Sequence, residues 1–138
     1  MNKKNLISNL KDIYCRIGVS QIHGVGVIAI RDIPKNINPF KMTNHYKEKT
    51  VTLTQKDLNN IPKEVNKMIY DFVAPVDGAY DIPLHGLNSM DITFYMNHCE
   101  NNNVKIVDTG GSYLSFITKR NIKKDEELTI NYNDYKMD

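Results

Sequence analysis

Short apolar segments bounded by glycine, proline or polar residues limit what this chain can fold into. The clearest runs from Val25 to Ile30 and contains only valine, isoleucine, alanine and one glycine. Such a continuous run is typical of a strand buried on both faces. It ends in the polar segment 31–36, where Pro34 predicts a reversal of the chain. Segments of this length favour a fold of several short strands.

The other predicted elements fit this reading. Alternation of apolar and polar residues predicts four more strands, at 13–17, 104–108, 113–118 and 127–132, the middle two joined in a hairpin by the turn 109–112. Helical spacing is clear only from Asn60 to Phe72, with Ala74-Pro75 as the stop, and weaker at 6–10. The pattern predicts a fold of the α+β class, mainly β.

Composition narrows the function classes. The 138 residues include 18 basic and 16 acidic ones, a net charge of +2, so contact with nucleic acid is expected to be at most indirect. Cys15 and Cys99 belong to no CxxC pair, which predicts no disulfide framework. A metal at His98-Cys99 is a competing interpretation, but no second cysteine stands at ligand spacing, and we expect no metal.

The chain start has a basic beginning but no apolar core of a signal peptide, and no apolar run approaches the length of a membrane span. We therefore expect a cytoplasmic or nuclear protein without a membrane partner.

Three segments carry the functional signal. The first is His23-Gly24-Val25-Gly26-Val27, the second is Tyr95–Asn103 with the pair Asn97-His98, and the third is Lys124–Tyr132. Each has an ordinary structural interpretation: a turn or bulge, a loop that caps its own backbone, and a turn followed by a strand. The first also lacks the third glycine and the following helix of a dinucleotide fingerprint.

In this order the three motifs resemble the SET-domain protein lysine methyltransferases. The resemblance extends to "SQIHGVGVIAIRDIPKN" and "SFITKRNIKKDEELTINY" and covers about residues 13–135. It implies a SET fold of several short β-sheets with a C-terminal pseudoknot and one to two helices. We expect a single minimal SET domain over 1–138 without cysteine-rich flanking segments, in which 1–11 is an N-terminal extension and 54–90 a variable insert region.

The resemblance also implies roles for individual residues. Tyr132 would be the catalytic tyrosine. The residues implied to bind the cofactor S-adenosylmethionine are His23, Gly24, Val25, Gly26, Asn97 and His98. The candidates for the wall of the lysine channel are Tyr80, Tyr95, Phe116, Ile130 and Tyr135.

The chemistry is consistent with these residue types. A lysine in water has a pKa of about 10.4 and is protonated, whereas methyl transfer needs the neutral amine. An apolar, aromatic-walled channel beside a positive sulfur disfavours the ammonium, so a tyrosine can serve without a strong general base.

The chain departs from the family pattern at several positions. Cys99 replaces a serine, Asn102 a proline, and Asn36 stands where glycine is common. Ile130 falls where the family often has Phe or Tyr, which leaves the number of methyl groups transferred open.

The implied partner is a lysine-containing protein substrate, with a histone as one candidate. Because only 133–138 remain to close the channel, a homodimer is one way to complete it. Two alternatives stay open at this point: a catalytically inactive SET-fold protein-interaction module, and a small β-rich interaction domain.

Overall fold

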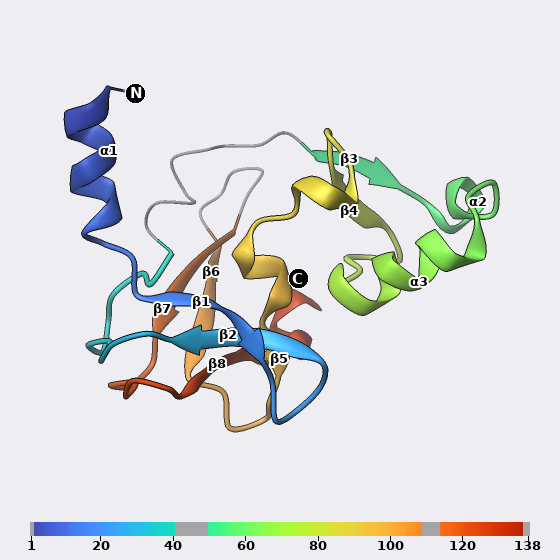
Figure 1. The fold of residues 1–138 in the computed structure, drawn as a ribbon. Coiled ribbons are helices and arrows are strands. Elements are labelled where there is room, and N and C mark those ends of the chain that lie inside the picture. The colour runs from blue at the N-terminus through green and yellow to red at the C-terminus, as the bar shows by residue number, and fades with distance from the viewer. Residues whose placement is uncertain (1, 41–49, 109–113, 137–138) are drawn as a thin grey trace.

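A computed structural model describes residues 2–40, 50–108 and 114–136, except for the side chains of 108, 135 and 136 (Figure 1). The helical elements are α1 Lys3–Leu10, α2 Gln55–Leu58, α3 Lys63–Phe72 and the 3₁₀ turns η2 Leu87–Ser89, η3 Ile92–Tyr95 and η4 Tyr132–Lys136. The strands are β1 Cys15–Val19, β2 Val25–Ala29, β3 Thr50–Leu53, β4 Tyr80–Pro83, β5 Asn97–His98, β6 Val104–Asp108, β7 Leu114–Thr118 and β8 Glu127–Ile130.

The strands of the described part form three small sheets. The largest has the order β1-β2-β8-β5, while β3 pairs with β4 and β6 with β7. Strand β8 runs antiparallel to β2 on one side and parallel to β5 on the other. The last strand of the chain therefore lies inside the main sheet and brings the three sequence motifs together. The pseudoknot stays a prediction.

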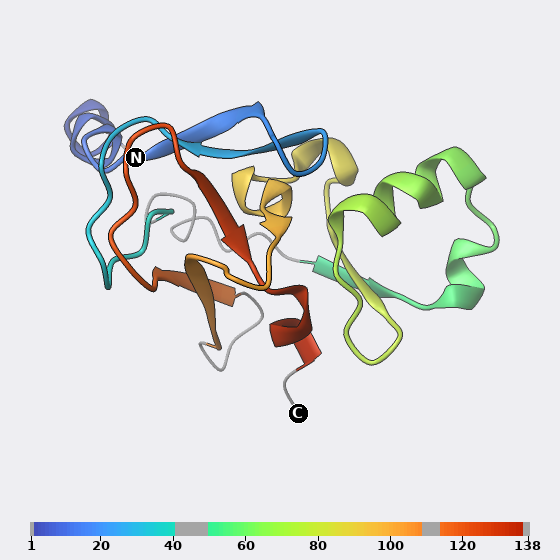
Figure 2. The same cartoon turned by 90° about the horizontal axis from the view of Figure 1, so that it is seen from below.

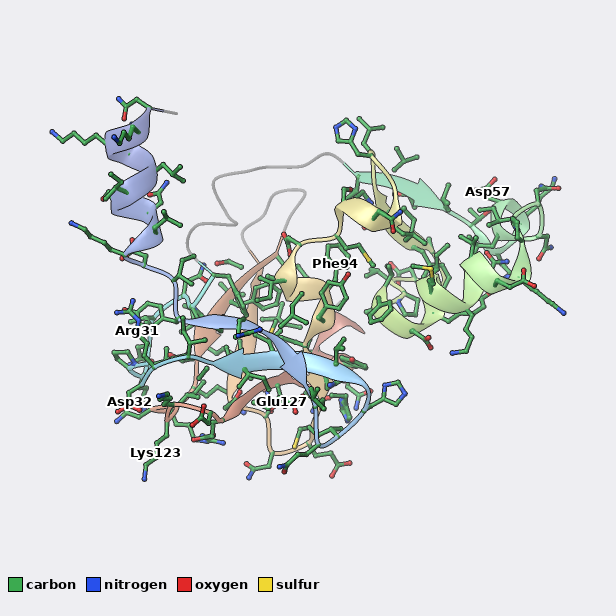
Figure 3. All side chains as sticks on the ribbon, viewed as in Figure 1. Arg31, Asp32, Asp57, Phe94, Lys123 and Glu127 are labelled. Atoms are coloured by element: carbon green, nitrogen blue, oxygen red, sulfur yellow. The ribbon has the colours of Figure 1, made fainter. Side chains whose placement is uncertain are left out.

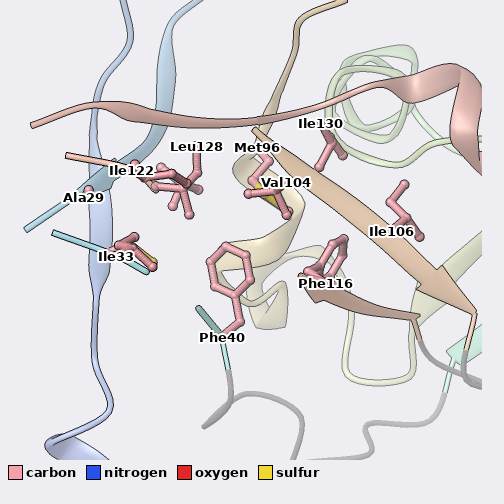
Figure 4. Packing of buried hydrophobic residues seen from close by; sticks show 12 residues of the cluster. Ala29, Ile33, Phe40, Met96, Val104, Ile106, Phe116, Ile122, Leu128 and Ile130 are labelled. Atoms are coloured by element: carbon pink, nitrogen blue, oxygen red, sulfur yellow. The ribbon is translucent and has the colours of Figure 1, made fainter. Parts of the chain in front are cut away.

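One main core joins the four-stranded sheet to the β6–β7 pair (Figure 4). Val27 and Ala29 of β2 face it together with Leu128 and Ile130 of β8, all four fully buried. In the apolar run 25–30, however, Val25 and Ile30 are 42% and 40% exposed, so the prediction that the whole run is buried on both faces is wrong at its ends. The other buried members are Cys15, Ile33, Phe40, Met96, Val104, Ile106, Phe116 and Ile122.

A smaller core belongs to the segment that contains β3, β4 and the two helices between them. Leu58, Ile69 and Val73 are its buried centre. Figure 2 shows this segment to one side of the four-stranded sheet. The expectation of a variable insert at 54–90 is not tested by this arrangement, but the segment does have apolar packing of its own.

The strands predicted over 25–30, 104–108 and 113–118 are confirmed as β2, β6 and β7, with β2 ending one residue earlier and residue 113 outside the described residues, and β6 and β7 pair antiparallel. The turn predicted at 109–112 lies outside the described residues. The strand expected over 13–17 is β1, two residues later at both ends. The strand expected over 127–132 ends at Ile130, because η4 begins at Tyr132.

The predicted helix start at Asn60 is wrong. The Asn60 N–H bonds back to Asp57 O at 3.2 Å and so closes the turn of α2, and α3 begins only after Pro62. Helix α2 was not predicted, although Thr54 and Asp57 form a capping box at its start. The stop at Ala74-Pro75 is confirmed, since α3 ends at Phe72.

Asn36 has φ 67°, in the left-handed region that glycine favours and asparagine tolerates. This conformation explains how Asn replaces the family's usual glycine at this position. No helix in the described ranges combines the length and the apolar character needed to span a bilayer.

Candidate active site

The parallel pairing of β5 with β8 places the second and third motifs side by side. Asn97 is opposite Thr129 and His98 is opposite Ile130. The pairing continues for one more residue, since the Cys99 N–H donates to Ile130 O at 2.9 Å. Two segments that are distant in sequence thus share one short ladder.

The buried Asn97 amide connects this ladder to the first motif. Its Nδ2 lies 2.9 Å from Val25 O and 3.1 Å from His23 O, both main-chain acceptors of the glycine turn. It also lies 2.9 Å from Oε2 of Glu127. Because a buried amide nitrogen of this kind holds the backbone that it contacts, Asn97 fixes the path of the turn over the sheet.

Glu127, which is labelled in Figure 3, and Ser20 complete this network. The Ser20 hydroxyl donates to the Glu127 carboxylate at 2.7 Å and accepts the N–H groups of Ile22 and His23 at 2.9 and 3.1 Å. Sequence reasoning did not select either residue, although both lie within segments that carry the family resemblance.

The two glycines of the first motif are required for different reasons. A Cβ on Gly26 would lie 2.5 Å from Oε2 of Glu127, so a side chain there would collide with the carboxylate. Gly24 has φ 53° and is exposed, and a Cβ there would meet no atom within 4 Å. Gly26 makes room for the network, whereas Gly24 lets the turn close, with its carbonyl accepting the Ser20 N–H at 2.9 Å.

Tyr132 is held against the Asn97-His98 segment at two points. Its hydroxyl donates to Met96 O at 3.0 Å, and its own N–H donates to Nδ1 of His98 at 3.0 Å. The His98 and Tyr132 ring centroids are 5.2 Å apart. Since Nδ1 is the acceptor of this hydrogen bond, this ring nitrogen carries no hydrogen of its own.

The residue Tyr132 is 40% exposed, so it lies at the protein surface. Burial of the rest of the ring raises the pKa of Tyr132, the charge of Glu127 raises it further, and a hydrogen bond with the His98 backbone partly offsets both. The group therefore stays a neutral phenol at physiological pH.

The sequence matches the model of the SET domain over residues 24–133. The chain belongs to the SET-domain family. No curated protein matches it, but it resembles the crystal structure of the Plasmodium falciparum "putative histone methyltransferase", with a TM-score of 0.54 and 21% identity over 87% of this chain and 93% of that one. At this identity the likeness shows the fold alone. The SET fold is thus confirmed, and SET domains are generally methyltransferases.

The SET domain brings Tyr132, Asn97, His98 and the turn 23–26 together, but it places the other candidates in packing positions. Phe116 and Ile130 are buried in the main core, and the Phe116 ring contacts Phe40 edge-on at 5.7 Å. Tyr80 belongs to the smaller core and contacts the Tyr70 ring.

Tyr95 packs on the main core and against the Phe72 ring at 5.1 Å. The side chain of Tyr135 lies outside the described residues. A channel role for these aromatic residues stays a prediction.

Two asparagines of the SET domain support the ladder from the 99–104 loop. The Asn103 side chain donates to Glu127 O at 2.8 Å and accepts the Thr129 N–H at 2.8 Å, as a neighbouring strand would. Asn102, where the family usually has proline, donates to Val104 O at 2.9 Å and accepts from Lys119. The replacement therefore has a structural explanation.

Within the described ranges, no group of three or more His, Cys, Asp or Glu side chains could hold a metal ion.

Proposed function

We propose that this SET domain is a protein lysine N-methyltransferase that uses S-adenosylmethionine. The observation that carries the proposal is the position of Tyr132, which two hydrogen bonds attach to the same segment that holds the glycine turn through Asn97. One phenol and one exposed stretch of backbone are thereby fixed relative to each other. Such fixed geometry is what group transfer without covalent catalysis requires.

The residues present are consistent with the cofactor. Gly24 is exposed beside open space, and its N–H makes no hydrogen bond within the described part of the chain. Glu127 contributes a negative charge that is not in an ion pair among the described residues, which suits a cationic ligand. When bound, S-adenosylmethionine supplies a methyl group on a positively charged sulfur.

We assign the residues of the site the following roles in binding and catalysis. The turn 23–26 would hold the cofactor through backbone groups, with Asn97 and Glu127 keeping that turn in place. Because the pKa of Tyr132 is raised, its hydroxyl would act as a hydrogen-bonding group and not as a base. The substrate lysine must then lose its proton through desolvation at the site.

The substrate class is a lysine-bearing protein segment. The Plasmodium falciparum protein of similar fold carries histone methyltransferase in its name. Histones are therefore the first substrates to test, followed by a cell lysate.

A transfer assay with labelled S-adenosylmethionine tests the proposal. Wild type and Tyr70→Phe should label the substrate, while Tyr132→Phe should lose at least about tenfold in rate, because its hydroxyl is the only group removed. Tyr70 is a matched control, since it is an exposed tyrosine on α3 whose hydroxyl is also hydrogen-bonded, in this case as the acceptor from the Gln55 side chain.

Calorimetry with S-adenosylmethionine separates a catalytic defect from lost binding. Cofactor affinity should be nearly equal in wild type and Tyr132→Phe. Equal labelling by the two proteins would contradict the role of Tyr132. Absence of both labelling and cofactor binding in wild type would support the interaction module instead.

A further inference from the structure

We propose that the outer edge of β1 is a homodimer interface, in which the β1 strands of two copies pair antiparallel with Ile17 opposite Ile17. The two four-stranded sheets would then form one continuous sheet. This inference does not depend on the methyl-transfer proposal, because it is tested by molecular mass, although Glu127 belongs both to the candidate active site and to the hollow beside this edge.

The position of β1 in the sheet is the first observation. Among the described residues, β1 pairs with β2 along one side and is the end strand of the order β1-β2-β8-β5. Figure 2 shows it at the margin of the molecule. A strand edge of this kind offers N–H and C=O groups in the spacing that another strand needs.

The hydrogen bonds on either side of β1 fix which residues offer those groups. Tyr14 O accepts from Ile30 N, and Ser20 N donates to Gly24 O, so these even-numbered positions bond toward β2. Because bonding alternates along an antiparallel pair, the backbone groups of Cys15, Ile17 and Val19 point outward. On the exposed edge, Arg16 Nε donates to Ile17 O at 3.2 Å. In the proposed pairing, the Ile17 N–H of the second copy would replace Arg16 Nε as the donor to this carbonyl.

One face of this edge is apolar. Ile17 is 40% exposed and Val19 is 86% exposed, although both share the face on which Val27 is fully buried. The core covers one end of the β1–β2 pair and leaves the Val19 end uncovered. In the proposed register Ile17 packs on its own copy and Val19 lies opposite Cys15, which removes apolar surface from water.

The other face is complementary in charge and shape. In the proposed register Arg16 lies opposite Gly18 of the second copy, in a narrow pair without hydrogen bonds. Gly18 lines a hollow of about 540 Å³ together with Asp125, Glu126 and Glu127, and Arg16 and Val19 of the same chain also line it. Neither Asp125 nor Glu127 is in an ion pair within the described part, while Glu126 already pairs with Arg120.

The absence of a side chain on Gly18 makes this contact possible. Gly18 lies one strand spacing of about 4.8 Å from Arg16 of the second copy and β2 lies two spacings away, about 9.6 Å, so the extended arginine passes over Gly18 toward β2. That strand carries Gly26, over which the Glu127 carboxylate lies. By symmetry the contact forms twice, which is why a second copy fits this edge better than an unrelated strand.

Sedimentation or light scattering of the whole chain over a range of concentrations tests the proposal. Wild type should have twice the 15.9 kDa mass of one chain at high concentration. Val19→Lys and Arg16→Glu should remain monomeric, the first because it places a charge in the apolar contact and the second because it places an acid opposite the acidic hollow.

Two matched substitutions serve as controls. Val51→Lys changes an exposed valine on β3, and Lys105→Glu reverses an exposed charge on β6. Both should dimerise like wild type. A wild type that stays monomeric at millimolar concentration would overturn the proposal, as would dimers of Val19→Lys or loss of the dimer in either control.

Amide hydrogen exchange gives an independent measurement of the register. Exchange at Cys15, Ile17 and Val19 should slow as the concentration rises, whereas exchange on β6 should not change. A dimer in which these three amides exchange as in the monomer would place the interface elsewhere and reject the β1 edge.

Discussion

Glu127 carries an unusual combination of contacts for a carboxylate at the centre of a site. It accepts hydrogen bonds from the Ser20 hydroxyl and the Asn97 amide, it lies over Gly26, and its charge raises the pKa of Tyr132. One side chain thus connects the glycine turn, the β5–β8 ladder and the phenol. Its neutral partners leave the negative charge uncompensated within the described residues.

Gly26→Ala tests whether the carboxylate packs over the turn. The new Cβ would lie 2.5 Å from Oε2 of Glu127, and we expect a loss of about 1–3 kcal/mol in the free energy of unfolding. Urea unfolding followed by circular dichroism measures it. In a Glu127→Ala background the same substitution should cost much less, because the obstructing group is gone. An equal loss of unfolding free energy with and without the Glu127 side chain would contradict a collision between the new Cβ and the carboxylate.

The ionisation of Tyr132 gives a pH prediction. Its pKa is raised above the ordinary 10.0, so the folded state keeps this proton more tightly than the unfolded chain does. The resulting stabilisation is complete below pH 10 and is lost as the pH rises through the raised pKa. The difference between the tyrosinate absorbance titrations of wild type and Tyr132→Phe should show one group titrating above 10.0. A group titrating below it would contradict the assignment.

At the scale of elements, α1 differs from the strands of the main sheet because none of its side chains is buried. The helix contains Leu6, Ile7 and Leu10, yet none of its residues is buried. Its end is nevertheless tied to the body by Arg31, which donates to Lys11 O and Ile13 O and lies 4.0 Å over the Tyr14 ring (Figure 3).

Removal of residues 1–8 should therefore change the free energy of unfolding by no more than about 0.5 kcal/mol, because no packed side chain is lost. Arg31→Ala should cost about 1 kcal/mol, since it removes two hydrogen bonds and the ring contact. Thermal and urea unfolding give both values. A truncation as costly as a core substitution would mean that α1 packs on the body.

At the scale of the whole molecule, the two apolar clusters are built from different parts of the chain. The main core joins strands from both ends of the sequence, whereas the smaller one is confined to residues between Leu53 and Phe94. A cluster built within one segment can open without disturbing the rest. We infer that the smaller core is an opening unit of its own.

Leu58→Ala and Leu128→Ala form a matched pair that tests this inference, since both leucines are fully buried. Each substitution should lower the free energy of unfolding of the cluster that contains it by about 2–5 kcal/mol. In native-state hydrogen exchange, Leu58→Ala should speed exchange in α3 and β4 and leave β2 unchanged, whereas Leu128→Ala should affect all of them. Faster exchange of β2 in Leu58→Ala would show one cooperative unit.

Local patterns in the sequence were sufficient for several elements. The apolar run 25–30, the alternation at 104–108 and the helical spacing up to Phe72 each predict an element that is confirmed, although the exposed ends Val25 and Ile30 show that the run 25–30 is buried only in its middle. The family resemblance rests on short motifs of the same local kind, and the SET fold is confirmed as well.

Pairings between distant segments were decided only by the tertiary structure. The two-residue strand β5 has no recognisable period, and β3 meets β4 across an intervening pair of helices. Likewise Ser20, Asn97 and Glu127 form a network that no spacing predicts. Burial of one face produces a periodic pattern of apolar residues along a single segment, so the sequence reveals it. A hydrogen bond between side chains that are remote in sequence depends on how the segments pack, and no local pattern reveals it.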